Sequence, residues 1–490
     1  MKDLSGSIKK VLVVYLFLIV GLISYIAYFQ VFKAPEIADK PQNKRLWAER
    51  NKVLRGTIYD RNKNPLTTSQ RKDVLTQKRQ YVYGDLYAHV LGYVDPRYGL
   101  TGLENQYDSE LRKYNSVTLK SFLKSLNIKD AFKNRDEKEE KVGNGLITTL
   151  DTNLQKVAYE ALGNNKGSIV ALDPKTGEIL ASVSKPSFNP NDLENVMNQA
   201  NSGKLKDNPL INRAVSGMYP PGSTFKVVTL ASALENLPGV TSRTFEDNGK
   251  IQFNSKDSLK NLDGNAYGNL SLKQALAVSS NVVFGTLALE LGNDKLKATA
   301  EKFGFNQNVP SDGTVLDTSK FPTLKSYEKG NIAQSGIGQS SILATPMEMA
   351  LVASTIANDG VMMEPRLVNE VVNKDGELVR KISPKSVKTV ISKDNANIIK
   401  DYMRYLVAER VPRDSSWNRA FGGLDAAGKT GTADYKLANG TDATPHSWFI
   451  GFAPANNPKV AVAVIVENGG AGGGIAAQLA GRVMRAALGK

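Results

Sequence analysis

A serine and a lysine three residues apart carry side chains that could act as a nucleophile and its base. Ser223 and Lys226 follow the segment 219–222, which reads Tyr-Pro-Pro-Gly, and an apolar run comes after them. Two prolines and a glycine interrupt the chain, so we expect a helix that starts at Ser223 and places both side chains on one face. A neutral lysine amine can accept the serine proton, and free N–H groups at a helix start can bind an oxyanion. This pattern favours acyl transfer through Ser223.

The spacing Ser-x-x-Lys is weak by itself, because it occurs six times, starting at Ser7, Ser69, Ser121, Ser182, Ser223 and Ser326. Only the copy at Ser223 combines a Pro-Pro-Gly break with an apolar helical pattern. A later Ser279-Ser280-Asn281 offers a second hydroxyl for a proton relay and an amide that could hold a substrate. A third motif, Lys429-Thr430-Gly431-Thr432, stands before a strand-like segment that begins near Trp448. The three motifs in this order are far more specific than any one of them.

Other chemistries fit the sequence less well. The chain has no cysteine and two histidines, which excludes thiolate metal sites and argues against a His-rich one. Residues 423–430 match the phosphate-binding pattern Gly-x4-Gly-Lys-Thr, but residues 431–434 are a poor helix start. No Gly-x-Ser-x-Gly elbow supports a Ser-His-Asp hydrolase, and we interpret His446 as a half-buried structural histidine. We therefore expect neither a metal nor a cofactor.

The N-terminal residues predict a membrane anchor. No charged side chain lies between Lys10 and Lys33, so residues 11–32 are long and apolar enough to cross a ~30 Å hydrocarbon core as a helix. Lysines dominate residues 1–10, which the positive-inside rule leaves in the cytoplasm while the rest of the chain crosses. A cleaved signal peptide is the alternative. The formal net charge of +15 suits an anionic membrane or wall layer, and no motif supports nucleic-acid binding.

The elements that must hold the three motifs follow from hydrophobic spacing. Residues 33–145 are polar and are expected to form a small membrane-proximal domain, with an exposed helix end or linker at 133–141. A catalytic domain is expected over 146–490, beginning with a helix over 154–162 and ending with a helix over 479–487. Between them lie strand-like pairs, 168–172 with 178–183 and 448–453 with 460–466, and a mostly helical middle. Hairpin-linked strands indicate an antiparallel sheet covered by helices, an α+β fold.

Taken together, the motifs resemble those of the class B penicillin-binding proteins, particularly the short type with a small membrane-proximal domain. The resemblance covers nearly everything after the anchor, including the segments 55–61, 102–104, 336–339 and 448–454. Ser340 departs from the family, which usually has glycine there. The resemblance implies a penicilloyl-serine transferase fold. Its parts are an antiparallel sheet flanked by helices, a largely helical subdomain, an N-terminal pedestal domain and one transmembrane helix.

The resemblance also implies a peptidoglycan D,D-transpeptidase that β-lactams inhibit. Ser223 would attack the penultimate D-alanine carbonyl of a stem peptide, and Lys226 would take its proton. Ser279 would relay a proton to the leaving amine, while Asn281 would hold the substrate backbone and orient Lys226. Lys429 would lower the pKa of Lys226 and attract the terminal carboxylate.

In the same resemblance, Thr430 and Thr432, on either side of Gly431, would bind that carboxylate through their hydroxyls. The backbone N–H groups of Ser223 and Thr432 would form the oxyanion hole. A polytopic glycan polymerase is the partner that the family implies, contacted through the anchor and the pedestal.

Three related functions stay open. A D,D-carboxypeptidase passes the acyl group to water instead of an amine, and these motifs do not encode that choice. A β-lactam-hydrolysing or sensing relative shares them, and Glu194 with Asn198 has the spacing of a deacylation pair but precedes Ser223. The non-enzyme alternative is a scaffold of a cell-wall synthesis complex.

Overall fold

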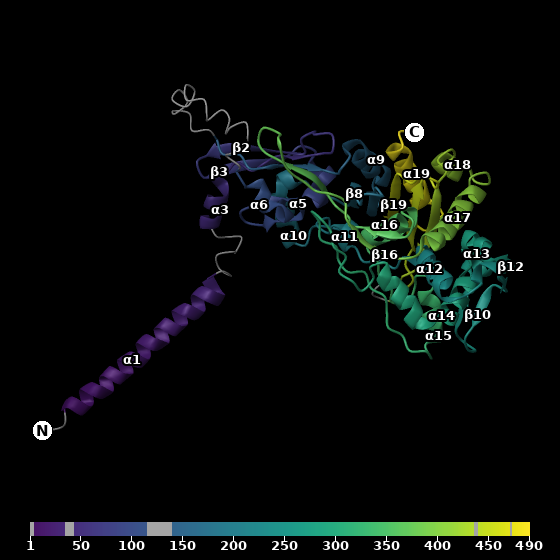
Figure 1. The fold of residues 1–490 in the computed structure, drawn as a ribbon, viewed down its shortest axis with the longest axis horizontal. Helices are drawn as coiled ribbons and strands as arrows, with labels where there is room; N and C mark the ends of the chain where they lie inside the picture. The colour runs from purple at the N-terminus through teal and green to yellow at the C-terminus, as the bar shows by residue number, and fades with distance from the viewer. Residues whose placement is uncertain (1–3, 35–43, 115–139, 436–439, 471–472) are drawn as a thin grey trace.

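The computed structural model describes residues 4–34, 44–114, 140–435, 440–470 and 473–490 (Figure 1). Helix α1 (Leu4–Tyr28) and the π-helical turn η1 (Phe29–Lys33) form one apolar rod that stands clear of the other elements. Side chains from Val11 to Phe32 are largely exposed along it, and the helix over Ile8–Lys33 is long and apolar enough to cross a membrane. The predicted anchor, residues 11–32, lies within it.

Short elements follow the rod, in the region 33–145 that was predicted to form a membrane-proximal domain. They are α3 (Lys44–Asn51), β1 (Ile58–Tyr59), β2 (Thr67–Asp73), β3 (Thr76–Tyr81), η2 (Gly84–Tyr87), α4 (Ala88–Leu91), β4 (Val94–Asp95), β5 (Gly99–Leu100), α5 (Gly102–Gln106) and α6 (Asp108–Leu111). Strands β2 and β3 pair as an antiparallel hairpin. Of the predicted linker at 133–141, residues 133–139 lie outside the described part of the chain.

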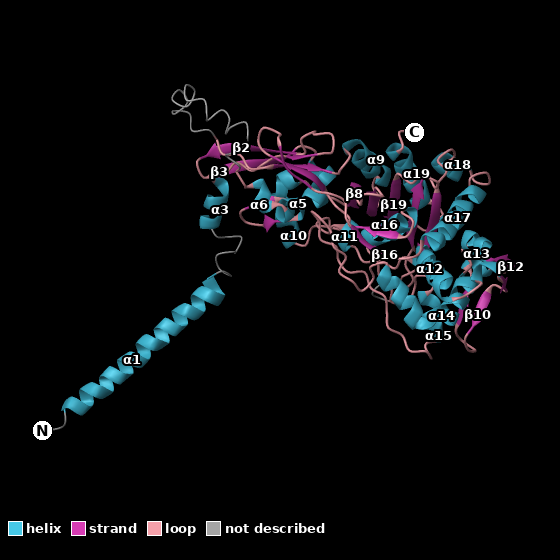
Figure 2. Ribbon diagram, viewed as in Figure 1, coloured by secondary structure: helices cyan, strands magenta, loops and turns pink. Residues whose placement is uncertain are grey.

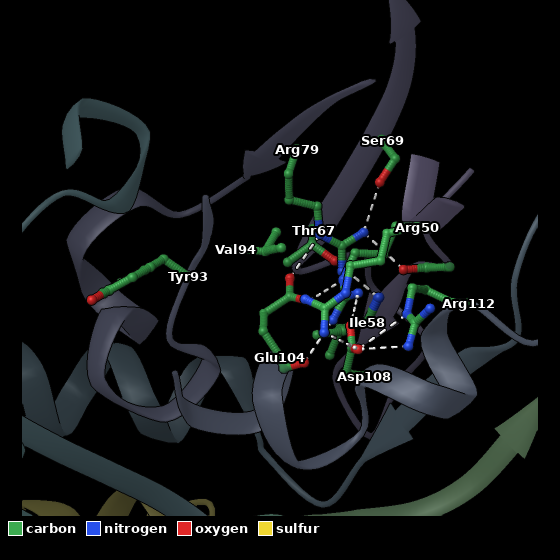
Figure 3. Close-up of polar contacts among 12 residues, drawn as sticks. Arg50, Ile58, Thr67, Ser69, Arg79, Tyr93, Val94, Glu104, Asp108 and Arg112 are labelled. Carbon is green, nitrogen blue, oxygen red and sulfur yellow. Dashed lines mark hydrogen bonds and ion pairs between the residues drawn. The ribbon is translucent and has the colours of Figure 1, made fainter. Parts of the chain in front are cut away.

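A buried ion cluster holds these short elements together (Figure 3). The Arg55 guanidinium donates to Glu104 Oε2 at 2.5 Å and to Asp108 Oδ1 at 2.6 Å, and Arg79 Nε donates to Glu104 Oε1 at 2.7 Å. Although burial opposes it, the two arginines hold the pKa of the Glu104 carboxyl below its ordinary value. Removing one partner of such a cluster would leave a buried charge uncompensated. The motifs around Arg55 and Glu104 therefore have a structural explanation.

A small sheet joins strand β1 of this region to strands from later in the chain. Strand β1 pairs in parallel with β6 (Gly145–Thr148), and β6 pairs antiparallel with β14 (Val368–Val372). β15 (Leu378–Lys381) completes the order β1-β6-β14-β15. The sheet thus combines strands from both sides of the domain boundary predicted at residue 145, and that boundary stays a prediction.

The central sheet has five antiparallel strands in the order β17-β18-β19-β7-β8. They are β17 (Ala427–Ala433), β18 (His446–Ala453), β19 (Val460–Val466), β7 (Gly167–Leu172) and β8 (Ile179–Lys185). Four of them were predicted. Alternate residues of β19 face two cores, with Ala461, Ala463 and Ile465 on one side and Val462 and Val464 on the other. A strand buried on both faces must be apolar throughout, as β19 is.

Helices cover both faces of the sheet. On one face α9 (Thr152–Leu162), α18 (Ser415–Phe421) and α19 (Ile475–Ala487) pack together over β18, β19 and β8. On the other face lie α11 (Arg213–Ser216) and α16 (Pro346–Ala357), which contacts β7, β18 and β19. Figure 2 shows two of the strands, β8 and β19, among the helices α9, α16 and α19. The helices α9 and α19 confirm the two predicted from apolar spacing. The antiparallel sheet flanked by helices confirms the expected α+β fold.

A helical subdomain extends from the edge of the sheet that β17 forms. Its helices are α12 (Lys226–Asn236), α13 (Leu272–Val278), α14 (Asn281–Lys302), α15 (Lys329–Ser335) and α17 (Lys393–Arg410). α12 packs on α14, α13 packs on α17, and α17 packs on β17. The three motifs therefore meet where the subdomain joins the edge strand.

Candidate active site

Ser223 lies in a single 3₁₀ turn, η4 (Gly222–Phe225), and α12 begins three residues later at Lys226. The sequence predicted that the helix would start at Ser223, so the nucleophile is one turn further out than expected. Two hydrogen bonds hold the residues just before this turn. Trp448 Nε1 donates to Pro220 O at 3.0 Å, and Thr224 Oγ1 donates to Pro221 O at 2.7 Å. Ser223 thus projects from a fixed loop and not from a fraying helix end.

The backbone around Ser223 lies directly against strand β17. A Cβ placed on Gly222 would be 2.4 Å from Thr432 O, and one placed on Gly431 would be 2.9 Å from Pro221 O. Gly222 also has a φ of +53°, which a residue with a side chain rarely adopts. Two glycines therefore permit a close approach of the serine turn and the strand, which brings the backbones of Ser223 and Thr432 together.

Lys226 is fully buried, and its amine makes three hydrogen bonds to the second motif. Lys226 Nζ donates to Ser279 O at 2.7 Å, to Asn281 Oδ1 at 2.7 Å and to Ser279 Oγ at 3.1 Å. Within the described part of the chain no hydrogen bond joins Lys226 to Ser223. Catalytic hydrogen bonds often tighten only when substrate is bound. The structure therefore brings the base predicted for Ser223 together with Ser279 and Asn281.

The second motif forms the junction between α13 and α14. Ser279 ends α13 in the left-handed region with a φ of +60°, and Ser280 caps α14 by accepting from Val283 N at 3.0 Å. Ser280 Oγ donates to the buried Asp247, which also accepts twice from Asn261 Nδ2. Asn261 Oδ1 in turn accepts from Asn281 N at 2.7 Å. This network fixes the tight turn that points Ser279 and Asn281 at Lys226, and no local sequence pattern predicts it.

Lys429 lies inside strand β17 and joins the same hydrogen-bond chain. Its Nζ donates to Ser279 Oγ at 2.9 Å and to Thr430 O at 2.9 Å. The sequence placed this motif before a strand and missed that it is a strand, β17, paired with β18. Because a strand continues through residues 427–433, the alternative phosphate-binding loop, which needs a helix there, is wrong.

Burial of the two lysines changes their protonation. Burial lowers the pKa of Lys226 to about 7, although Asp247 opposes the shift. Burial lowers the pKa of Lys429 well below its ordinary value, and the charges of Lys226 and Arg410 add to the effect. A lysine with a pKa near 7 is partly neutral at physiological pH and can accept a proton.

A cavity of about 500 Å³ opens in front of these groups. Ser223, Ser279, Asn281, Thr430 and Thr432 all line it, so the three motifs face one space. Gln339, from the segment 336–339 that resembles the family, also lines the cavity, together with four residues that were not predicted: Lys260, Tyr267, Arg410 and Asp434. None of these four belongs to a recognisable motif, and they reach the cavity only through the packing of the subdomain.

The loop 336–340 supports the back of the serine turn. Gly338 O accepts from Gly222 N at 3.0 Å, and Gly336 O accepts from Thr229 Oγ1 at 2.7 Å. Ser340 has a φ of +66°. That conformation explains why glycine is common at the position, and serine adopts it here at a cost of roughly 1–2 kcal/mol.

Residues of the other candidate motifs lie elsewhere. His446 is buried, stacks on Tyr435 with ring centroids 4.3 Å apart, and accepts from Asn468 N at 3.2 Å. Lys175, which begins a second Lys-Thr-Gly copy in the sequence, lies in the turn between β7 and β8. Glu194 pairs with Arg97 at 2.8 Å on the exposed surface, away from the residues that line the cavity.

Comparison with known proteins identifies the family. Residues 167–485 match the model of the penicillin binding protein transpeptidase domain. The chain belongs to this family. Residues 55–138 match the penicillin binding protein A dimerisation domain, and the chain is a class B penicillin-binding protein, as its motifs predicted.

Relatives share almost the whole length of this penicillin-binding protein. It is 35% identical to the peptidoglycan D,D-transpeptidase PbpA of Mycolicibacterium smegmatis, with 99% of each chain covered. The peptidoglycan D,D-transpeptidase MrdA of Acinetobacter baumannii is 32% identical over 82% of this chain and 65% of its own length. The ceftriaxone acyl-enzyme complex of penicillin-binding protein A from M. tuberculosis superposes with a TM-score of 0.78, at 32% identity over 90% of this chain and all of that one.

Proposed function

We propose that the chain is a peptidoglycan D,D-transpeptidase that acts through an acyl-enzyme on Ser223. The observation that carries the proposal is the continuous hydrogen-bond chain from Asn281 through Lys226 and Ser279 to Lys429, beside a cavity that Ser223 lines. Such a chain can move a proton away from a nucleophile and back to a leaving group.

The acylation step follows from this arrangement. Neutral Lys226 takes the Ser223 proton while Oγ bonds to the penultimate D-alanine carbonyl carbon. The carbonyl becomes an oxyanion, held by the N–H groups of Ser223 and Thr432. Its collapse breaks the peptide bond, and a proton passes through Ser279 to the leaving amine of the terminal D-alanine. Loss of one oxyanion donor typically raises such a barrier by ~3–4 kcal/mol.

Substrate binding and deacylation use the remaining groups. The terminal carboxylate binds at Lys429, Thr430 and Thr432, and Asn281 holds the peptide backbone. An amine on a neighbouring stem then attacks the ester carbon and gives its proton to Lys226. The ester bond to Ser223 Oγ breaks as Lys226 returns this proton to Oγ, which regenerates Ser223. A β-lactam enters the same path, opens its ring on Ser223 and leaves slowly.

We further propose where the chain works and with whom. The rod over Ile8–Lys33 fits a single membrane span, and the lysines before it favour a cytoplasmic N-terminus with the catalytic residues outside. Residues 33–145 serve as the pedestal of the catalytic domain, 146–490. A polytopic glycan polymerase is the expected partner, contacted through the anchor and the pedestal, and neither a cofactor nor nucleic acid has a role.

The test is a product assay with the purified full chain and stem pentapeptides. Equal amounts of free D-alanine and crosslinked peptide are expected, and Ser223→Ala should produce neither. Ser326→Ala is the matched control, because Ser326 begins another Ser-x-x-Lys copy in an exposed turn. D-Alanine with only shortened monomers would make the protein a carboxypeptidase, and no product from the wild type would favour the scaffold.

A further inference from the structure

Arg410, at the C-terminal end of α17, belongs to none of the three motifs and yet lines the active-site cavity. Its guanidinium lies over the Trp417 ring, 5.1 Å from the centroid. Its Nη1 would be 2.9 Å from a Cβ placed on Gly473, so the guanidinium lies directly against this glycine. Trp417 is itself fixed, since its Nε1 donates to Gly473 O at 2.9 Å. The guanidinium is thus held between a ring and a backbone segment at the cavity wall.

The guanidinium makes no direct ion pair among the described residues, although the charge of Asp414 attracts it. Within the described residues Arg410 makes neither an ion pair nor a side-chain hydrogen bond, and Asp434, on the same cavity, is not paired with it. The nearby Asp414 caps α18 by accepting from Ser416 N and Trp417 N. Arg404, on the same helix, pairs with Asp425 at 2.6 Å. An arginine that is packed in place and has no hydrogen-bonded carboxylate can form that bond with one from outside.

A second cation, Lys429, lies near the part of the cavity that Arg410 lines. Lys429 reaches Thr430, which lines the cavity together with Thr432 and Arg410. Arg410 is close enough for its charge to contribute, after burial and Lys226, to lowering the pKa of Lys429. An anion bound between the two cations would relieve their repulsion and find hydroxyl donors beside them.

We propose that Arg410 binds the terminal carboxylate of the donor peptide, and the equivalent carboxylate of a β-lactam, together with Lys429. The inference rests on the proposed function, because it assigns a second cation to the substrate of the same site. The role is one of specificity, since the guanidinium contacts a part of the substrate that does not react. A planar fork that is already packed suits the two oxygens of a carboxylate.

The experiment compares acylation by benzylpenicillin and by its methyl ester, which lacks the negative charge. Second-order acylation rates are measured for the full-length wild type, Arg410→Gln, Arg410→Lys and Arg413→Gln. The control, Arg413, is 74% exposed on the neighbouring turn and pairs only with Glu409 among the described residues. The ester rate serves as the internal measure of an intact fold and of intact chemistry at Ser223.

We expect Arg410→Gln to lower the rate with the acid by about tenfold or more and to leave the ester rate within about twofold, the scale of a lost charged hydrogen bond. Arg410→Lys should recover part of the loss, and Arg413→Gln should match the wild type. An equal loss for acid and ester, or no loss for either, would overturn the assignment. A wild type acylated by neither compound would overturn the proposed function, and the role of Arg410 with it.

Discussion

Protonation of Lys226 is expected to set the pH dependence of Ser223 acylation. Burial lowers the pKa of this lysine to about 7, so about half of it is neutral at pH 7 and only about 1% at pH 5. If the neutral amine is the base, acylation should slow about fiftyfold between pH 7 and pH 5 and gain about twofold above pH 8.

The substitution Asn281→Asp shifts this profile in a direction that the geometry fixes. Asn281 Oδ1 accepts from Lys226 Nζ at 2.7 Å, and aspartate would replace it with a carboxylate of nearly the same shape. A negative charge this close favours the protonated lysine and typically moves a pKa by about 1–3 units. A rise of two units would slow acylation about fiftyfold at pH 7, and the rate should recover towards pH 9.

Stopped-flow acylation with a fluorescent penicillin from pH 5 to pH 9 measures both profiles. In Lys226→Ala the remaining slow acylation should lose the inflection near pH 7. Superimposable profiles for the wild type and Asn281→Asp would refute the assignment of Lys226 as the base, as would an inflection that persists in Lys226→Ala.

Two further predictions concern the framework of the site. Burial raises the pKa of Glu348 to about 8, although Lys388 opposes the shift, so the unfolded chain ionises first and stability should fall from about pH 4.5 to about pH 8. In Glu348→Gln this fall should disappear, so the variant should gain on the order of 4 kcal/mol in the free energy of unfolding at pH 8 relative to the wild type. Denaturant titrations measure this free energy across the pH range. Equal pH slopes for the two proteins would contradict the prediction. Gly222→Ala should slow acylation by at least about tenfold, because the new Cβ would clash with Thr432 O. Gly239→Ala is the control, since Gly239 has a similar positive φ and open space around it, and it should leave the acylation rate unchanged. Equal acylation rates in both glycine variants would show that the close approach to β17 is not required.

Much of the fold could be predicted, because the responsible patterns are local. Apolar spacing within a few residues predicts four strands, β7, β8, β18 and β19, and two helices, α9 and α19. Strand β17 did not, since Gly428 and Gly431 weaken any strand pattern. Gly428 is required for packing, as a Cβ there would be 2.2 Å from the Phe449 ring. That requirement comes from a neighbouring strand and cannot be seen along the sequence.

The candidate site divides in the same way. Ser223, Lys226, Ser279, Asn281 and Lys429 could be proposed because their motifs occur in a fixed order. Arg410 could not, because an arginine at the end of a helix is usually a solvated charge near carbonyl groups. The Asp247–Asn261 support of the second motif joins the end of strand β9 (Thr244–Asp247) to the residue after strand β11 (Ser258–Lys260), and only the folded chain brings them together.

Mass mapping of the penicillin adduct is the direct test that Ser223 is the acylated residue. The full-length protein is incubated with benzylpenicillin, digested, and searched for the peptide that carries the added mass. We expect one adduct, on Ser223, which is absent from Ser223→Ala and forms slowly in Lys226→Ala. An adduct on any other residue, or undiminished labelling of Ser223→Ala, would contradict it.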